Sequence, residues 1–355
     1  MKHSIIVGYG LAGFHFARVL QKQGKDFVVF SDQKPGASSN AGGVFNPTVL
    51  KRFTLAWNAI EFFEFAYPFY QNFEKEFQVS VFKKEPIVYA FRAISDHNNW
   101  SVAAQTEGLN RFMESELIQT SLGGVKEHIG HARLQNVGRV NIQKMLNIFR
   151  ERVLKEDFYE ESFEYDQVKF HDKWVEYKGI QAERIVFCQG YGLKTNPWFS
   201  YLPLTGSKGE FLHIRSNELS QERIIKGSGI FVVPMEEDLF WVGATFSRDD
   251  KSTVPTHQGK EWLMNKLNSL IHSSFEIVEH RAALRPTVKD RRPLLGRHPK
   301  KKQLYVLNGL GTRGLLMGPL LAEWLSQYID YDQVLPTPVT INRFKTYFDK
   351  KTSRS

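Results

Sequence analysis

The stretch Ser4-Ile-Ile-Val-Gly-Tyr-Gly-Leu-Ala-Gly13 decides the fold class of this 355-residue chain. Its first four residues, 4–7, are mostly β-branched and predict a buried strand. An apolar helix is expected over 14–23, with Gly24 as its natural stop. The run Phe27-Val-Val-Phe30 then predicts a second strand. Strand, glycine-rich turn, helix and strand in this order predict a βαβ unit.

The glycine spacing within this unit is typical of a dinucleotide-binding turn. Gly8 would make the tight turn, Gly10 would let the backbone approach a pyrophosphate, and Gly13 would let helix and strand pack closely. The helix N-terminus would offer N–H groups and a positive dipole end to the phosphates. Asp32, or the neighbouring Ser31, would accept a hydrogen bond from a ribose hydroxyl. Four neighbours of these residues are also predicted to bind the cofactor, namely Leu11, Ala12, Gln33 and Lys34.

The same pattern returns near the other end of the chain. Leu304-Tyr-Val-Leu307 predicts a buried strand, and Asn308-Gly-Leu-Gly-Thr-Arg-Gly314 is a second glycine-rich turn. An amphipathic helix follows over 315–328. Two such units far apart in sequence predict one Rossmann-like α/β domain, assembled from both ends of the chain and binding a dinucleotide.

The middle of the chain has a different pattern. Apolar and polar residues alternate over 206–279, with one helix expected over 262–271, and this favours a mostly antiparallel sheet. We therefore expect two domains. The expected ranges are 1–75, 125–205 and 280–355 for a discontinuous cofactor domain, and 76–124 and 206–279 for an inserted antiparallel-sheet domain.

Other elements can be predicted only locally. An aromatic-rich helix after Pro47 is expected to end or kink at Pro68. Strands are expected over 79–82 and 87–91, and Asn141 can cap a helix that carries an apolar stripe as far as Val153.

Composition places the chain among ordinary globular proteins. Hydrophobic residues make up 42% and charged residues 24% of the sequence. The single cysteine, Cys188, excludes an internal disulfide and fits a reducing compartment. Apolar runs fall short of the roughly 20 residues that a membrane helix needs, and the N-terminus does not resemble a signal peptide. We expect a cytoplasmic protein without membrane insertion.

The charge balance leaves one partner open. The formal net charge is +9, and basic surfaces attract phosphates, carboxylates and nucleic acids alike. The lysines and arginines are dispersed, with short clusters at Lys83-Lys84, at 300–302 and in the tail from Lys350. Scattered charges of this kind are ordinarily solvated surface, so nucleic-acid binding stays a hypothesis.

An ordered set of motifs resembles the D-amino-acid oxidase superfamily of FAD-dependent oxidoreductases, in particular its glycine- and sarcosine-oxidase-like members. The motifs span nearly the whole chain and occur in the order found in the family. Besides the turn at Gly8–Gly13, they are Ala37-Ser-Ser-Asn-Ala-Gly42, Gly206-Ser-Lys-Gly-Glu-Phe-Leu-His-Ile214, Val242-Gly-Ala-Thr245, Ala283-Leu-Arg-Pro-Thr-Val-Lys-Asp290, Pro293-Leu-Leu-Gly296 and Gly309-Leu-Gly-Thr-Arg-Gly-Leu-Leu316.

The resemblance implies an FAD that lies extended along these motifs and an inserted antiparallel-sheet domain that binds the substrate. Gly8, Gly10, Gly13 and Asp32 would hold its ADP half. The passage from pyrophosphate to flavin would be lined by Ser38, Ser39, Asn40, Ala41 and Gly42. The flavin ring would lie beside Gly309, Gly311, Arg313 and Gly314, and further cofactor-binding residues would be Gly190, Thr312 and Leu315. Some sarcosine oxidases tether flavin through a cysteine near the late motif, but Ala283-Leu-Arg285 stands there in this sequence. Noncovalent FAD is therefore expected.

The implied reaction is oxidation of the C–N bond of a small amine or amino acid, such as glycine, sarcosine, a D-amino acid or an N-substituted glycine. Arg285 would grip the substrate carboxylate, since a guanidinium binds carboxylates bidentately. A structural pairing of Arg285 with Asp290 or Glu279 is the alternative. Arg313 is the second candidate catalytic residue. Oxygen or a quinone would accept the electrons.

Two residue pairs allow a metal site or a further basic group near the flavin. His128 and His131 are spaced like a metal pair on one helix face, but the sequence offers no third ligand, and ordinary surface or core histidines are expected. Lys51 and Arg52 follow the small-residue loop at a place where some relatives carry basic residues near the flavin, and solvated charge explains them equally well.

The sequence also allows two alternative functions. The late glycine turn, 307–314, also resembles the oxidase domain of the bifunctional enzyme that modifies the tRNA wobble uridine by removing a carboxymethyl group. The basic charge supports a tRNA partner, whereas no companion methyltransferase domain is expected within these 355 residues. A flavoprotein that binds its cofactor without catalysis is the third hypothesis.

Overall fold

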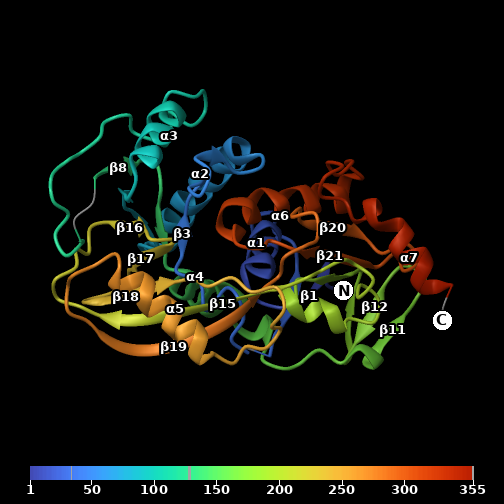
Figure 1. The fold of residues 1–355 in the computed structure, drawn as a ribbon. Helices are drawn as coiled ribbons and strands as arrows, with labels where there is room; N and C mark the ends of the chain where they lie inside the picture. Colours follow the sequence, from blue (N-terminus) through green and yellow to red (C-terminus); the bar gives the residue numbers. More distant parts are fainter. Residues whose placement is uncertain (33, 127–128, 354–355) are drawn as a thin grey trace. The chain divides into compact units, whose positions relative to one another are not determined.

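A computed structural model describes residues 1–32, 34–126 and 129–353 (Figure 1). The chain divides into two compact units. Unit 1 comprises Met1–Ser39, Ile142–Ser207 and Leu284–Ser355, and unit 2 comprises Asn40–Asn141 and Lys208–Ala283. Residues 40–75 and 125–141, which were expected in the cofactor domain, thus cluster with the unit that holds the antiparallel sheet.

Unit 1 is built on a six-stranded sheet with the order β10-β2-β1-β14-β21-β20. Its strands are β1 (Ser4–Val7), β2 (Phe27–Phe30), β10 (Phe158–Tyr159), β14 (Ile185–Phe187), β20 (Leu294–Arg297) and β21 (Leu304–Asn308). All neighbouring pairs are parallel except β20 and β21. The inner strands are buried along their whole length and are apolar except for Ser4 and Asn308, as suits a parallel sheet covered on both faces. The predicted α/β, Rossmann-like class is confirmed.

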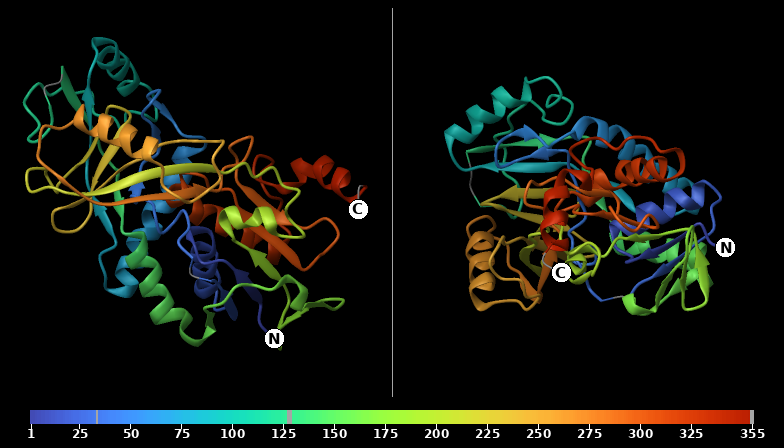
Figure 2. Two further views of the ribbon diagram at one scale, coloured as in Figure 1. Left: turned by 60° about the horizontal axis from the view of Figure 1, so that its bottom comes forward. Right: turned by 90° about the vertical axis from the view of Figure 1, so that its right-hand side faces the viewer.

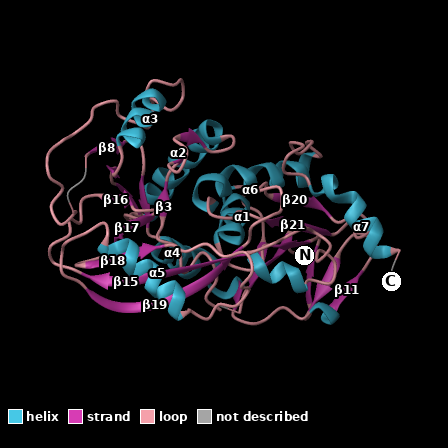
Figure 3. Ribbon diagram, viewed as in Figure 1, coloured by secondary structure: helices cyan, strands magenta, loops and turns pink. Residues whose placement is uncertain are grey.

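Two helices lie side by side on this sheet, namely α1 (Leu11–Lys22) and α6 (Gly314–Tyr331) (Figures 1 and 3). They approach closely because α6 has glycines where they touch. A Cβ on Gly314 would lie 2.9 Å from Leu11 Cδ1, and one on Gly318 would lie 2.1 Å from Nδ1 of the buried His15. Helix α1 begins three residues before the expected start, because the turn after Gly10 runs directly into the helix.

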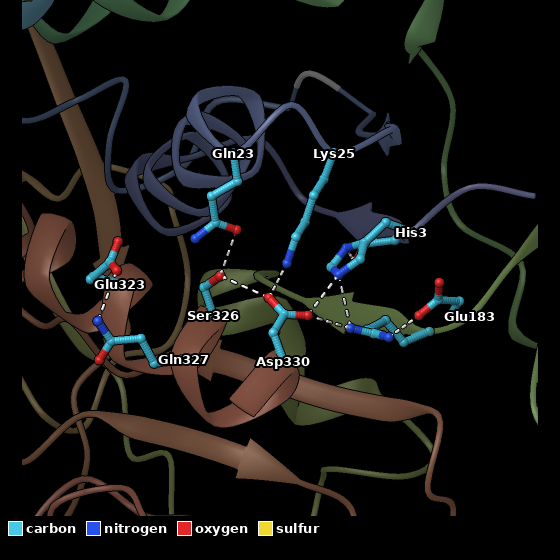
Figure 4. A network of polar contacts seen from close by, with 10 residues as sticks. His3, Gln23, Lys25, Glu183, Glu323, Ser326, Gln327 and Asp330 are labelled. Carbon is cyan, nitrogen blue, oxygen red and sulfur yellow. Dashed lines mark hydrogen bonds and ion pairs between the residues drawn. The ribbon is translucent and has the colours of Figure 1, made fainter. Parts of the chain in front are cut away.

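A network of polar contacts joins the amino ends of the strands in unit 1 (Figure 4). Asp330, near the end of α6, accepts hydrogen bonds from Lys25, Ser326 and Arg184 and contacts His3. Burial raises the pKa of Asp330, but the bonds from Lys25 and His3 outweigh it, so the pKa is lowered and the carboxylate stays charged. His3, Lys25 and Arg184 directly precede β1, β2 and β14. The glycine turns described below follow the opposite, carboxyl ends of β1 and β21.

The rest of unit 1 consists of smaller elements. A three-stranded antiparallel sheet contains β11 (Val168–Phe170), β12 (Val175–Tyr177) and β13 (Ile180–Ala182). The helical segments are α4 (Ile142–Phe149), a π-helical turn at Arg150–Leu154, short 3₁₀ turns at Lys155–Asp157, Tyr165–Gln167, Gly190–Thr195 and Ile341–Phe344, and α7 (Lys345–Thr352). The helix predicted as far as Val153 is therefore α-helical only to Phe149.

Unit 2 is built on a seven-stranded sheet with the order β19-β15-β18-β17-β16-β7-β8. The strands are β7 (Ile87–Phe91), β8 (Gly130–Leu134), β15 (Ser207–Arg215), β16 (Ile224–Gly227), β17 (Ile230–Pro234), β18 (Leu239–Gly243) and β19 (Glu276–Arg285). β16 and β7 run parallel, and the pairs β15–β18, β16–β17, β17–β18 and β7–β8 are antiparallel. The predicted antiparallel sheet is present.

The two faces of this sheet are covered differently. Helix α5 (His257–Asn268) packs on one face over an aliphatic cluster that includes Val232, Val242 and Leu263 (Figure 2). The other face is aromatic and is partly covered by α3 (Ile94–Ala104), whose Trp100 is fully buried. Helix α5 begins five residues before the predicted start, because the Thr256 side chain caps it by accepting a hydrogen bond from the Gly259 N–H.

The remaining elements of unit 2 correct two predictions. They are β3 (Val44–Phe45), β4 (Thr48–Val49), β5 (Thr54–Leu55), β6 (Phe82–Lys84), β9 (Gly138–Val140) and α2 (Ala59–Phe77). Helix α2 does not end at Pro68 but continues to Phe77, because seven buried residues hold its apolar face in the core against the cost of the proline. The strand predicted over 79–82 begins only at Phe82. Within the described ranges, every helix is too short or too polar to cross a membrane.

Candidate functional site

The turn after β1 in unit 1 leaves no space for side chains. Gly8 has a φ of +99°, and a Cβ there would lie 2.7 Å from the carbonyl oxygen of Cys188. Its N–H donates to Phe30 O at 2.8 Å, and the Cys188 N–H donates to Val7 O at 2.7 Å. β1 is thus bonded to β2 and β14 up to the point where the turn begins. Glycine is required here by both conformation and space.

The N-terminus of α1 lies directly beyond this turn. A Cβ on Gly13 would lie 2.0 Å from Gly8 O, so the helix packs against the turn without a side chain between them. Gly10 is the N-cap and brings no capping side chain of its own. Instead, Ser38 Oγ accepts a hydrogen bond from the Leu11 N–H at 3.0 Å. The predicted loop residue Ser38 therefore reaches the helix end where a phosphate would be bound.

Asp32 follows β2 at the same edge of the sheet. It accepts hydrogen bonds from the backbone N–H of Lys34 at 3.3 Å and from Ser162 Oγ at 3.4 Å, and Lys34 Nζ lies 3.0 Å away. Partial burial raises the pKa of Asp32, but the contacts with Lys34 outweigh it and lower the pKa overall. The carboxylate is ionised at neutral pH and can accept a hydrogen bond from a ribose hydroxyl. Gln33 lies outside the described residues.

A second turn follows β21 and is joined to the end of β14. The buried Asn308 donates from Nδ2 to Gly190 O at 3.0 Å and accepts from the Gly309 N–H at 2.7 Å through Oδ1. Gly309 has a φ of +76°, and a Cβ there would lie 2.7 Å from Val288 Cγ2. Asn308 was not predicted as a site residue, although a buried asparagine directly before a glycine turn is a usable signal.

This second turn also contacts the segment that follows Arg285. The Gly311 N–H donates to Pro286 O at 3.2 Å, and the Thr205 N–H donates to Thr287 O at 2.8 Å. Arg285 is the last residue of β19, and Arg313 is the N-cap of α6. The two predicted catalytic arginines therefore belong to two segments of unit 1 that are hydrogen-bonded to each other. Thr312, directly before Arg313, is exposed, and Leu315 is buried in the first turn of α6.

Both arginines are charged and partly removed from water. Burial lowers the pKa of Arg285, and it lowers the pKa of Arg313 to about 10. The two acids proposed as structural partners of Arg285 have other contacts. Asp290 accepts from Arg343 Nε at 2.8 Å, and Glu279 contacts Arg281 and His213. Two half-buried guanidinium groups beside a glycine turn can bind an anionic ligand.

The other predicted loop residues belong to two different places. Ser39 Oγ is bonded to the backbone of Gly36 within its own loop in unit 1. In unit 2, Trp241 Nε1 donates to Asn40 O at 3.2 Å, and a Cβ on Gly42 would lie 2.8 Å from the Trp241 ring. The indole explains why a glycine stands at 42. Ala41 between them is exposed. Trp241 was missed, because an isolated tryptophan in a strand gives no sequence signal of its own.

The hypothesis of a histidine metal pair gains no support from the structure. His131 lies in strand β8 and is buried, not on a helix face, and His128 lies outside the described residues. Among the residues that the structure describes, no group of three or more His, Cys, Asp or Glu side chains could hold a metal ion.

A family model for DAO, described as FAD dependent oxidoreductase, matches residues 3–328. The chain belongs to this family. Its cofactor is accordingly FAD, and the first glycine turn of unit 1 fits this dinucleotide, because a Cβ at Gly8, Gly10 or Gly13 would collide with Cys188, Ser38 or Gly8 and force the tight turn at the start of α1 apart. The predicted family, fold class and cofactor are confirmed, and the family is one of FAD-dependent oxidoreductases.

Curated relatives of this DAO-family chain carry two kinds of name. It is 23% identical, over 95% of its length and 56% of the relative's, to the tRNA 5-methylaminomethyl-2-thiouridine biosynthesis bifunctional protein MnmC of Marinobacter nauticus. It is 27% identical to glycine oxidase of Bacillus subtilis over 37% of this chain and 35% of that protein. The chain spans about half the length of the first of these and about a third of the second.

Solved structures show the same fold. Glycine oxidase from Geobacillus kaustophilus superposes with a TM-score of 0.75 and 17% identity over 94% of this chain and 95% of that one. L-amino acid deaminase from Proteus myxofaciens superposes with a TM-score of 0.77 and 12% identity over 97% of this chain and 93% of that one. The DAO-family fold therefore extends over both units of the chain.

Proposed function

We propose that this protein oxidises the C–N bond of a small amine or amino acid that bears a carboxylate, such as glycine, sarcosine, a D-amino acid or an N-substituted glycine. Bound FAD would supply the hydride acceptor. The C–H bond next to nitrogen breaks, its electron pair leaves with the hydrogen as hydride, and the nitrogen lone pair forms a C=N bond. Water then hydrolyses the imine to a carbonyl compound and an amine. Oxygen or a quinone takes up the electrons afterwards.

One observation carries this proposal. The hydrogen bond from the Gly311 N–H to Pro286 O joins the segment after Arg285 to the turn that contains Arg313. Two half-buried cations are thereby held next to the turn that is expected to lie beside the flavin. We assign to Arg285 the binding of the substrate carboxylate. The N-terminus of α6 would stabilise negative charge at the reduced cofactor through its positive dipole end. Unit 1 would hold the cofactor and unit 2 the substrate.

The FAD is proposed to be noncovalent. Cys188 is the chain's single cysteine, and its thiol is buried next to the turn at Gly8. Burial raises the pKa of this thiol far above its usual range, so the thiol stays protonated and is a poor nucleophile. Denaturing the protein with acid should release all of the flavin into solution, whereas flavin that stays with the precipitated chain would contradict the assignment.

Product analysis tests the reaction itself. The purified protein is incubated with each amine and an artificial electron acceptor, and the carbonyl product is trapped with a hydrazine. Glycine or an N-substituted glycine should give the hydrazone of glyoxylate. If no carbonyl forms from any amine while the flavin stays bound, the protein would be a non-catalytic flavin-binding protein or would act on a macromolecule.

A cytoplasmic location stays a prediction.

A tRNA-modifying oxidase is the second candidate function. The observation that favours it is the MnmC relative of Marinobacter nauticus, which aligns along 95% of this chain, together with the net charge of +9. The reaction would be the same, since a carboxymethylated amine on a nucleotide is also a secondary amine with a carboxylate. Binding of tRNA should then weaken steeply as salt rises, because phosphate contacts release counterions. Failure to retain tRNA even at low salt would exclude this function.

A further inference from the structure

The aromatic face of the seven-stranded sheet in unit 2 carries a lysine in an unusual position. Lys226 in β16 is level with Phe231 in β17 and with Tyr89 in β7. Phe231 is in turn level with Gly243 in β18, and Gly243 with Phe211 in β15. Side chains in register share one face of a sheet. Across the five strands β15, β18, β17, β16 and β7, this row therefore consists of three aromatic residues, a glycine and a single cation.

The contacts of Lys226 are those of a cation without an anion. Its Nζ lies 4.4 Å from the centre of the Phe231 ring. Throughout the described part of the chain, no carboxylate or hydrogen-bond acceptor pairs with this ammonium group. The same holds for the hydroxyl of Tyr89, whose ring packs against Phe53 and Trp100. Two neighbouring donors on one sheet face thus lack acceptors.

The environment of these donors favours an anionic ligand. Lys226 is half-buried, and desolvation lowers its pKa to about 8, so it is still mostly protonated at neutral pH. Burial, and secondarily the charge of Asp96, raises the pKa of Tyr89, which therefore remains a neutral donor. A poorly solvated ammonium gains more from an anion than an exposed one does, because little water has to be displaced. A carboxylate can accept from both donors through its two oxygens.

We propose that Lys226 and Tyr89 form a binding site for a carboxylate on the aromatic face of the sheet in unit 2. That this carboxylate is the substrate's own rests on the proposed function, whereas the site itself does not. The flat rings of Phe231 and Tyr89 would contact the apolar part of the bound molecule. The competing interpretation is a purely structural lysine held by the Phe231 ring. That interpretation predicts no response of Lys226 to anions.

Binding of benzoate to the holoenzyme tests the site, with benzamide as the neutral molecule of the same shape. Titration calorimetry should show benzoate affinity falling about tenfold or more in Lys226→Met, and several-fold in Tyr89→Phe. Lys226→Arg should keep most of the affinity, because it keeps the charge. Lys84→Met, at an exposed lysine of β6 in the same unit, should bind benzoate like the unaltered protein. Equal benzoate affinity in Lys226→Met and the unaltered protein would overturn the proposal.

A second measurement needs no variant and is independent of folding defects. A lysine whose pKa is about 8 has more neutral amine at pH 8 than an ordinary surface lysine, so Lys226 should be acetylated readily by an amine-reactive ester. Mass spectrometry should show that benzoate slows acetylation of Lys226 and leaves Lys84 unchanged, and that benzamide slows neither. Acetylation of Lys226 that is indifferent to benzoate would refute the site.

Failure of the site and failure of the proposed function can be told apart. If amines yield a carbonyl product but Lys226→Met leaves the KM of carboxylated amines unchanged, the proposed function stands and the site at Lys226 is wrong. If benzoate protects Lys226 but no amine is oxidised, the anion site stands and its natural ligand is another carboxylate. An increase in KM confined to carboxylated amines, with kcat nearly unchanged, is the result expected when both are right.

Discussion

At the scale of single residues, the central assignment concerns Arg285. Replacing it with alanine removes charge-assisted hydrogen bonds to the substrate carboxylate, which contribute about 1.5–3 kcal/mol. The kcat/KM for a carboxylated amine should fall about 10- to 100-fold, mainly through KM. Steady-state kinetics with sarcosine and N-methylated amines that lack a carboxylate measure this, and the latter should be nearly unaffected.

The control for this change is Arg281→Ala. Arg281 lies in the same strand, β19, but is exposed and bonded to Glu279. Its loss should leave kcat/KM within about twofold, since exposed ion pairs contribute little. If Arg285→Ala leaves the turnover of every carboxylated amine unchanged, Arg285 has no role in substrate binding.

Single residues also mark the limit of prediction from sequence. The glycines at 8, 10 and 13 could be predicted as a group, because conformation and close approach leave no alternative residue type. Asn308 and Trp241 could not, because their roles depend on partners 118 and 201 positions away, at Gly190 O and Asn40 O. Lys226 was missed for the same reason, since only strand register places it beside Tyr89.

At the scale of elements, the turn between β1 and α1 should tolerate no side chain at Gly13. Gly13→Ala would place a Cβ 2.0 Å from Gly8 O, and the helix would have to move away from the strand. We expect loss of bound FAD and a loss of stability of about 1–3 kcal/mol, as for an overpacked site. Flavin absorbance per protein and urea unfolding measure the two effects.

Gly36→Ala is the matched control in the neighbouring loop. A Cβ on Gly36 would meet nothing within 4 Å, so FAD content and stability should stay as they are. If Gly13→Ala retained its FAD as well as Gly36→Ala does, the glycine turn at the N-terminus of α1 would not be the cofactor site.

The contact between α1 and α6 should make stability depend on pH. His15 is fully buried there, and burial lowers its pKa from 6.5 to about 3. Below pH 6.5 the His15 imidazole binds a proton in the unfolded chain but not in the folded chain. The free energy of unfolding therefore falls as the pH drops from about 6.5 towards 3. Between pH 7 and pH 5, His15 should account for a loss of about 2 kcal/mol.

Urea unfolding at the two pH values checks this prediction. His15→Gln should lose less stability between pH 7 and pH 5 than the unaltered protein does. His257→Gln, at an exposed histidine of α5, should show the full loss. An identical pH dependence in all three proteins would mean that His15 is protonated as easily in the folded chain as in the unfolded one.

The elements show how far local patterns reach. Strands β1, β2, β7 and β21 follow the predicted runs to within one residue, because short and mostly apolar segments between turn residues leave little freedom in where a strand begins and ends. Helix ends were predicted less well. The start of α5 depends on the Thr256 cap, and the continuation of α2 through Pro68 depends on burial of its aromatic face. A short stretch of sequence shows neither the cap nor the burial.

At the scale of the whole molecule, FAD should contribute to the stability of the fold. A ligand that binds only the folded state adds about 2.7 kcal/mol at 100 times its Kd. Stripping the flavin should therefore lower the Tm by several degrees, on the order expected for a domain of this size, and adding FAD should restore it. Added NAD at the same concentration should not. A Tm that is insensitive to FAD would argue against a cofactor built into the fold.

The central claim is that this DAO-family protein oxidises a small carboxylated amine, and anaerobic reduction of its flavin tests it most directly. The purified protein is mixed without oxygen with a pool of glycine, sarcosine, D-amino acids and N-substituted glycines, and the visible flavin absorption is followed. The absorption should bleach, and splitting the pool should then identify the substrate. A flavin that stays oxidised with every member of the pool, while modified tRNA bleaches it, would contradict the claim.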